Sequence, residues 1–300
     1  MTLEQLRIFI AVAEREHVTQ ASRVLNLTQS ATSAAISALE DRHQVKLFDR
    51  IGRRIVLTEA GHAFLSEAHA VLKRAQAAES VLADLSGLKR GAFVLAASQT
   101  VANYWLPPHI QRFQKAHPGI AVSMTIGNTE TVATAIHDGI ADLGFVEGMI
   151  DDPALTVLTV ATDEILIVVS PDHPWASRKP NPKRDFKTAR WALREHGSGT
   201  RAIFEAALPA LGVKDGAIDV ALELPSNESV RAAVQAGDCV TAMSRLVVAN
   251  ALAAGTLRAI DIALPERRFS MLVHKERYRT AAAKAFATSL GETSQPEPVR

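Results

Sequence analysis

The sequence predicts a multidomain α/β protein in which a winged helix-turn-helix and a long helix precede two α/β lobes. Three observations support this class. The chain has 300 residues, more than one small domain usually contains. Residues 3–85 show helical periodicity interrupted by one short hairpin. From residue 92 onward candidate strands and helices alternate, which is typical of parallel sheets covered by helices.

The composition fits a globular chain, with 47% hydrophobic and 22% charged residues. The net charge of +1 does not indicate a nucleic-acid partner, but the local charge does. Between residues 42 and 54 one acid, Asp49, stands among basic residues, which are Arg42, Lys46, Arg50, Arg53 and Arg54. A basic segment on a nearly neutral chain is expected of a DNA-binding module attached to a larger protein.

Cys239 is the only cysteine, so neither an intrachain disulfide nor a cysteine-rich zinc site can form. A single thiol fits a reducing compartment, and a small buried side chain is its ordinary role. The apolar run Ile8–Ala13 is too short for a signal peptide, and no stretch approaches the ~18 apolar residues of a membrane span. We therefore expect a cytoplasmic protein with no membrane partner.

The first segment is expected to form three short helices. Apolar residues recur at helical spacing from Leu3 to Ala13, and Thr19 is a plausible N-cap for the second helix. Thr28 is a plausible N-cap for a third helix that runs to about Asp41. Two short helices joined by a brief turn form the helix-turn-helix plan. The alternative is an ordinary helical bundle whose polar face is merely solvated.

Residues 49–58 are expected to form a hairpin with Gly52 at its turn. Arginines at the tip of such a wing can neutralise phosphates or enter the minor groove. A surface hairpin with solvated arginines is the alternative. The predicted DNA contacts are Thr28, Gln29, Ser30, Ser33, Arg50, Arg53 and Arg54.

A long helix is expected from Glu59 to about Leu85, with Thr58 as its N-cap. Its apolar residues follow an alternating spacing of four and three, and they are Phe64, Ala68, Val71, Ala75, Ala78, Leu82 and Leu85. This narrow a/d seam favours dimerisation over packing against the chain's own core. Dimerisation also suits DNA, because paired recognition helices read a two-fold-symmetric site.

The remaining chain is expected to form two lobes after a hinge at residues 88–91. The candidate strands are Ala92–Ala97, Ile120–Ile126, Asp142–Val146, Glu164–Ser170, Ala189–Leu193, Ile218–Leu224 and Cys239–Met243. The candidate helices are Leu106–His117, Thr131–Asp138, Thr200–Leu211, Ser229–Ala236 and Leu246–Ala254. The predicted domains are residues 1–58 (winged helix-turn-helix), 59–87 (linker helix), 92–162 with 266–290 (first lobe), 163–265 (second lobe) and a disordered tail at 291–300.

Four polar junctions between strands and helices predict a ligand cleft. In open α/β sheets ligands bind beyond the carboxyl ends of the strands, where helix N-termini attract anions. The candidate effector-binding residues are Ser98, Gln99, Thr100, Asn128, Thr129, Glu147, Ser198, Thr200, Arg201 and Asn227. Each junction alone is an ordinary capping motif, but four that converge favour a ligand. Because the set offers neither an aromatic cage nor a large apolar pocket, a small oxyanion or short carboxylate fits best.

Glu147 is the unusual member of this set, because an ionised carboxylate repels an anion. It should turn away, pair with Arg201, or bind in its protonated form. Our hypothesis is that Glu147 makes effector binding depend on pH.

Several of these runs resemble the LysR-type transcriptional regulators. They are Thr19–Ser30 (TQASRVLNLTQS), Leu47–Arg50 (LFDR) and Leu57–Gly61 (LTEAG). The resemblance covers the whole chain and implies an effector domain similar to periplasmic binding proteins, a homodimer or homotetramer, and RNA polymerase as a partner. Ala34 and Ala35 stand where many members carry longer polar or basic residues, which implies fewer base contacts here.

Within the effector domain, three runs resemble the branch that contains regulators of sulfite reduction, with carbon-fixation regulators as cousins. The runs are Asp142–Gly148 (DLGFVEG), Leu193–Arg201 (LREHGSGTR) and Ser226–Ser229 (SNES). This resemblance implies sulfur metabolism and sulfite, or a similar small oxyanion, as the effector. A small carboxylate or a sugar phosphate is the alternative.

The spacing of candidate catalytic residues argues against an enzyme. The run Gly197–Gly199 lacks both the first glycine of a G-x-S-x-G elbow and the lysine of a P-loop. The ten histidines form no H-E-x-x-H pattern, so neither a metal nor another cofactor is expected. The competing class is a cytoplasmic solute-binding protein without DNA activity.

Overall fold

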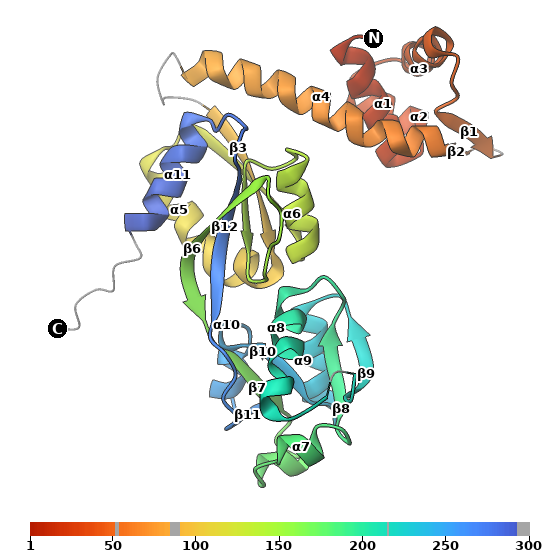
Figure 1. The fold of residues 1–300 in the computed structure, drawn as a ribbon. Helices are drawn as coiled ribbons and strands as arrows, with labels where there is room; N and C mark the ends of the chain where they lie inside the picture. The colour runs from red at the N-terminus through yellow and green to blue at the C-terminus, as the bar shows by residue number, and fades with distance from the viewer. Residues whose placement is uncertain (52–53, 85–90, 215, 293–300) are drawn as a thin grey trace. The chain divides into compact units, whose positions relative to one another are not determined.

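The computed structural model describes residues 1–51, 54–84, 91–214 and 216–292 (Figure 1). The chain divides into two compact units, Met1–Leu85 (unit 1) and Ser86–Arg300 (unit 2). The predicted turn at Gly52, the wing residue Arg53, the seam residue Leu85 and most of the predicted hinge and tail lie outside the described residues. Of the described helices, none is long and apolar enough to cross a membrane.

Unit 1 contains three short helices, a hairpin and a long helix. Their bounds are α1 Leu3–Arg15, α2 Val18–Val24, α3 Gln29–His43, β1 Phe48–Ile51, β2 Arg54–Leu57 and α4 Glu59–Asp84. The predicted caps of α3 and α4 are confirmed: Thr28 accepts a hydrogen bond from the Ala31 amide, and Thr58 accepts one from the Gly61 amide. The predicted cap of α2 is wrong, because α2 begins one residue before Thr19 and His17 is its N-cap.

The core of unit 1 forms around α1, whose buried residues contact the hairpin and α4. The ring of Phe9 lies 5.4 Å from that of Phe48 and 4.9 Å from that of Phe64. Gly61 permits the close approach of α4, since a Cβ atom there would lie 2.2 Å from the carbonyl oxygen of Leu47. The hairpin and the long helix are thus fixed to the three-helix body through one shared core.

Unit 2 contains two lobes. Lobe 1 is a five-stranded sheet in the order β4-β3-β5-β12-β6. Its elements are β3 Gly91–Ser98, α5 Leu106–Ala116, β4 Ile120–Gly127, α6 Thr129–His137, β5 Leu143–Val146, β6 Leu155–Asp163, β12 Arg267–His274 and α11 Ala281–Glu292, with a π-helical turn at Val101–Trp105. One face of the sheet packs against α5 and α11, and the other packs against α6.

Lobe 2 combines the sheet β10-β7-β11 with the parallel pair β8-β9. Its elements are β7 Ile165–Val169, α7 Pro182–Asp185, β8 Arg190–Arg194, α8 Gly199–Ala207, β9 Asp219–Leu224, α9 Asn227–Ala236, β10 Thr241–Ser244, α10 Arg245–Ala253 and β11 Arg258–Ile260, with 3-10 turns at Pro174–Ala176 and Pro209–Leu211. The chain passes between the lobes along β6 and β12, which are hydrogen-bonded neighbours (Figure 1).

The expectation of mostly parallel sheets is wrong for a large part of unit 2. Strand β3 runs parallel to β4 and β5, and β8 runs parallel to β9. Strand β12, however, enters lobe 1 from lobe 2 and is antiparallel to both β5 and β6, while β7 is antiparallel to β10 and β11. No candidate strand or helix covered β6, β11, β12, α7 or α11.

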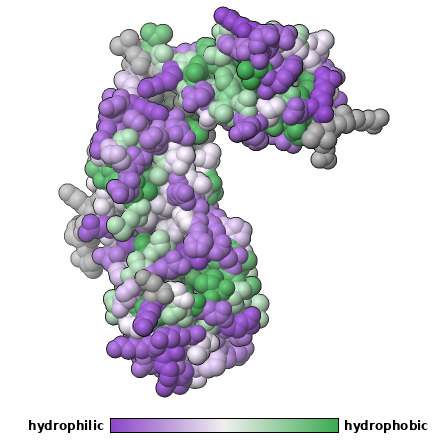
Figure 2. Space-filling model, turned by 45° about the vertical axis from the view of Figure 1, so that its right-hand side comes forward, coloured by the Kyte–Doolittle hydropathy of each residue, from purple (hydrophilic) through white to green (hydrophobic). Residues whose placement is uncertain are grey.

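On the face shown in Figure 2, polar side chains cover most of the surface of each unit, and smaller apolar areas lie among these polar side chains. Other polar and charged side chains of unit 2 are buried instead of exposed. The buried polar and charged side chains include Ser98, Thr100, Glu147, Arg194, Thr200 and Arg267. Burial of so many polar groups between the lobes marks the region where a site should be sought.

Candidate functional site

The N-terminus of α3 presents the predicted base-reading residues. Gln29 and Ser30 are exposed and Ser33 is half-buried. The hydroxyl of Thr28 is already engaged, because it caps α3 and lies 3.0 Å from the hydroxyl of Ser30. Thr28 therefore fixes the start of the helix. Gln29 and Ser30 face solvent, with the Ser30 hydroxyl hydrogen-bonded to that of Thr28, and Ser33 is partly covered.

The wing carries Arg50 on β1, where it is exposed and stands opposite Ile55 of β2. Strand β2 begins at Arg54, directly after residues 52–53, which are not among the described residues. The described part of the hairpin has the expected antiparallel register, from Phe48 opposite Leu57 to Ile51 opposite Arg54. Arg50 is thus placed on the wing as the sequence predicted.

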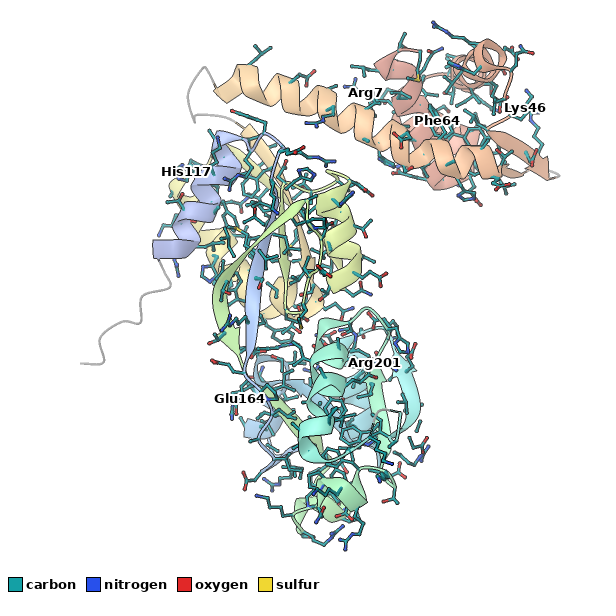
Figure 3. The ribbon with its side chains drawn as sticks, in the orientation of Figure 1. Arg7, Lys46, Phe64, His117, Glu164 and Arg201 are labelled. Carbon is teal, nitrogen blue, oxygen red and sulfur yellow. The ribbon has the colours of Figure 1, made fainter. Side chains whose placement is uncertain are left out.

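A buried carboxylate ties α3 to the wing. Glu40 accepts hydrogen bonds from the backbone amides of Leu47 and Phe48, at 2.8 and 3.1 Å, and pairs with Lys46 at 2.8 Å (Lys46 is labelled in Figure 3). Burial alone raises the pKa of Glu40, but the hydrogen bonds from Lys46, Leu47 and Phe48 outweigh it and hold the pKa below its ordinary value. The positive charge of Lys46 is therefore partly committed to the fold.

The predicted dimerisation seam divides into two parts. Phe64 and Ala68 pack inside unit 1, and Ala68 is fully buried (Phe64 is labelled in Figure 3). The prediction that Ala68 faces a partner is therefore wrong, because the first turns of α4 complete the unit's own core. Phe64 packs against the same core but is only half-buried, so its predicted role at a dimer interface stays a prediction. Farther along, Val71 is 39% exposed and Leu82 is 70% exposed. Ala75 is half-buried and Ala78 is exposed, so the later part of the seam remains uncovered within the unit.

In unit 2 the predicted junctions converge where strands end. Ser98 ends β3, Asn128 follows β4 and Glu147 follows β5 in lobe 1. In lobe 2, Asn227 begins α9 shortly after β9 ends. Hydrogen bonds join the two sets: Gln99 donates to the Pro225 carbonyl at 2.9 Å and accepts from the Asn227 amide at 3.0 Å. The side chain of Asn227 also donates to Thr100 at 3.1 Å.

Glu147 lies at the centre of this region, with its side chain 2% exposed. The Ser98 hydroxyl is hydrogen-bonded to its carboxyl group, and an Nη atom of Arg267 lies 3.8 Å away. Burial raises the pKa of Glu147, and the charges of Arg267 and Arg194 oppose this only in part. The charges beside Glu147 are thus those of Arg267 and Arg194. Pairing with Arg201, one of the three arrangements expected for Glu147, is therefore wrong.

Arg201 is held elsewhere. Its guanidinium donates to Glu223 at 2.6 Å, to Glu205 at 2.8 Å and to the Arg194 carbonyl at 2.9 Å (Arg201 is labelled in Figure 3). These three partners belong to lobe 2, so Arg201 organises that lobe rather than facing the carboxyl group of Glu147.

Arg267 was not among the site residues predicted from the sequence. Its side chain is fully buried and donates to Asp163 at 2.7 Å and to the Thr200 hydroxyl at 2.8 Å. Asp163 ends β6 and Arg267 begins β12, so this ion pair lies where the chain crosses between the lobes. Ser244 of lobe 2 also donates to Asp163, at 2.8 Å. No local signal could have revealed this, because its partners are distant in sequence.

The N-terminus of α8 offers unused hydrogen-bond donors. Its N-cap, Ser198, is buried and its side chain forms no capping hydrogen bond, unlike those of Asn128 and Ser226. The hydroxyl of Thr129 faces this end and is buried without a hydrogen-bond partner. A Cβ atom on Gly199 would lie 2.6 Å from that hydroxyl and 2.7 Å from the amide nitrogen of Gly148.

These groups share one hollow between the lobes. Its lining includes Thr129, Glu147, Gly148, Gly199 and Arg267. Free amide groups at a helix start, a neighbouring hydroxyl and a buried carboxyl group can together hold a small oxygen-rich ligand. Within the described residues, no cluster of three or more His, Cys, Asp or Glu side chains is placed to hold a metal ion.

Comparison with known proteins gives matches over both units. Residues 3–62 match the family described as "Bacterial regulatory helix-turn-helix protein, lysR family", and residues 86–295 match "LysR substrate binding domain". The chain is 34% identical over 288 residues to the HTH-type transcriptional regulator YeiE of Escherichia coli K12, covering 95% of this chain and 96% of that protein.

Two solved structures share the fold. Full-length CbnR complexed with its target DNA has a TM-score of 0.73 at 21% identity, covering 98% of this chain and 100% of that one. The regulatory domain of CcmR from Synechocystis PCC6803, in complex with 2-PG, has a TM-score of 0.63 at 24% identity, covering 70% of this chain and 100% of that one.

Proposed function

Because the chain belongs to the LysR family of bacterial transcriptional regulators, we propose that a small oxyanion bound between its lobes controls how it sits on DNA. The chain is a DNA-binding regulator with an effector-binding domain, and its relatives are regulators rather than enzymes. In this proposal lobe 1 corresponds to residues 92–162 with 266–290, and lobe 2 to residues 163–265. The protein acts in the cytoplasm and contacts RNA polymerase.

One observation carries the choice of ligand. The uncapped start of α8 and the unpartnered hydroxyl of Thr129 meet in a buried place, where unsatisfied polar groups are costly. An oxyanion would accept hydrogen bonds from both and would be favoured by the helix dipole. Sulfite is the first candidate within this class.

A small carboxylate or a phosphorylated metabolite is the second candidate. It is favoured by the structural neighbour CcmR, whose regulatory domain was solved with 2-PG, which is 2-phosphoglycolate. The same amide and hydroxyl groups serve a carboxylate or a phosphate, so the effector class is decided by ligand binding.

Dimerisation is proposed through the exposed part of the α4 seam, from Val71 to Leu82. Two heads held together in this way read a two-fold-symmetric operator. Gln29, Ser30 and Ser33 are proposed to read base edges, while Arg50, Arg53 and Arg54 contact phosphates. Pairing of dimers through unit 2 gives the tetramer.

A thermal-shift panel tests the ligand class. A ligand that binds only the folded protein stabilises it by ~2.7 kcal/mol at about 100 times its Kd, which corresponds to a rise in Tm of roughly 5–10 °C for a unit of this size. The full-length protein is heated with sulfite, sulfate, phosphate, thiosulfate or small carboxylates. We expect at least one of them to raise Tm by this amount.

Thr129→Val is the informative variant, because its hydroxyl makes no hydrogen bond within the chain. It should leave the Tm of the free protein unchanged or slightly higher, while the ligand-induced rise falls by half or more. Thr288→Val on α11 is the matched control, since it removes a surface hydroxyl and should keep the full response. If no compound raises Tm, or if both variants respond like the wild type, the proposed anion site is wrong.

A further inference from the structure

The buried guanidinium groups around the cleft already have carboxylate partners. Arg267 lies 2.6 Å from Asp163, Arg194 lies 2.7 Å from Glu195, and Arg201 has its pair in Glu223. Glu147 has no cation to itself, because its nearest described cation, Arg267, is already paired with Asp163. An anion that reaches the buried part of this site therefore meets the carboxyl group of Glu147 beside arginines that are already paired. Arg268 also lines the hollow, but its side chain is exposed.

Several elements of both lobes surround Glu147. The hydroxyls of Ser98 and Thr100 approach its carboxyl group from lobe 1, Arg267 approaches from β12, and the charge of Arg194 acts from β8. Asp163, at the end of β6, adds a further negative charge beside Arg267. With its side chain almost fully buried, an ionised Glu147 is poorly compensated.

Glu147 also lines the hollow between the lobes, together with Thr129, Gly148 and Gly199. An ionised carboxylate has only hydrogen-bond acceptors, and so does a fully ionised oxyanion. Two such groups side by side repel each other unless a proton lies between them. A proton on either group turns the repulsion into a hydrogen bond.

We infer that the cleft binds its effector anion together with one proton, which is shared with Glu147. The inference rests on the proposed function and narrows its ligand class to oxyanions of weak acids. An anion that keeps a proton near neutral pH brings this proton itself. An anion of a strong acid requires the proton to be on Glu147, so its affinity falls once the pH exceeds the pKa of Glu147, which burial raises.

Phosphate and sulfate test this inference, because both are tetrahedral oxyanions of similar size. Phosphate retains a proton near neutral pH and sulfate does not. Affinities are measured by calorimetry on the full-length protein on either side of neutral pH. At the alkaline end of this range, where Glu147 is ionised, the wild type should bind phosphate about tenfold more tightly than sulfate, or better. Sulfate binding should weaken as pH rises. Above the pKa of Glu147 it should take up about one proton, measured in two buffers of different ionisation enthalpy.

Glu147→Gln is the matched variant, because its amide donates hydrogen bonds at every pH. The preference for phosphate should shrink to within about threefold, and sulfate binding should lose its pH dependence and its proton uptake. The proton measurement on the wild type does not depend on how the variant folds.

The outcomes separate the two proposals. If the wild type binds sulfate as tightly as phosphate at every pH and without proton uptake, or if Glu147→Gln keeps the preference, the shared proton is wrong while the anion site stands. If neither anion binds and the Tm panel is also negative, the proposed oxyanion effector itself is wrong.

Discussion

Replacing Arg267 with methionine is expected to lower the free energy of unfolding of unit 2 by about 3–5 kcal/mol, the usual cost of breaking a buried ion pair. The change leaves the carboxylate of Asp163 buried without its cation and removes the hydrogen bond to Thr200. Both side chains of the pair are almost inaccessible, at 0% and 3% exposed, so water cannot replace the lost partner.

The double variant Arg267→Met with Asp163→Asn is the control. It removes both charges and keeps an oxygen that can accept from Ser244. Its stability should return to within about 1–2 kcal/mol of the wild type, because the removal of a whole buried pair is often nearly neutral. Urea unfolding followed by tryptophan fluorescence measures this selectively, since Trp105, Trp175 and Trp191 all lie in unit 2. A single variant as stable as the wild type, or a double variant as unstable as the single one, would contradict the role given to the pair.

DNA affinity is expected to fall steeply with salt. A protein that neutralises ~6–10 phosphates loses roughly 10³–10⁵-fold in affinity between ~50 and ~200 mM salt, because bound counterions are released on association. In a dimer, two wings with Arg50, Arg53 and Arg54 would supply most of these contacts. Fluorescence anisotropy over a range of salt concentrations, on operator and on random duplex, measures the slope.

Arg50→Ala and Ser33→Ala separate the two kinds of contact. Arg50→Ala should weaken binding to both duplexes and reduce the salt slope by about 1 per head. Ser33→Ala should leave the slope unchanged and reduce discrimination between operator and random duplex by ~1–3 kcal/mol. Equal losses on both duplexes for Ser33→Ala would show that Ser33 does not read bases.

Local signals predicted unit 1 well, because its helix starts depend on nearby residues. Thr28 and Thr58 cap α3 and α4 as expected, since each needs only an amide three residues ahead. The prediction of Thr19 as the N-cap of α2 was wrong, because His17 is also able to cap and the helix begins one residue before Thr19. The alternation of strands and helices likewise located the junctions of the cleft.

Such local signals could not predict contacts between residues that are distant in sequence. A heptad seam looks the same whether it faces a partner or the chain's own core. Ala68 was therefore assigned to a partner surface although it is buried in unit 1. Arg267 and Arg268 are adjacent in sequence, but strand alternation buries the first and exposes the second. Only the return of β12 from lobe 2 brings Arg267 to Asp163 and Thr200.

The central claim is that an anion in the cleft changes the way the paired heads sit on DNA. A ligand does this only if its affinity differs between the two arrangements. The direct measurement is fluorescence energy transfer between the ends of an operator duplex bound by the full-length protein, with and without the anion that raises Tm. We predict a change in the end-to-end distance that Thr129→Val abolishes at the same anion concentration. An anion that raises Tm but leaves both this distance and the DNA affinity unchanged would contradict the account.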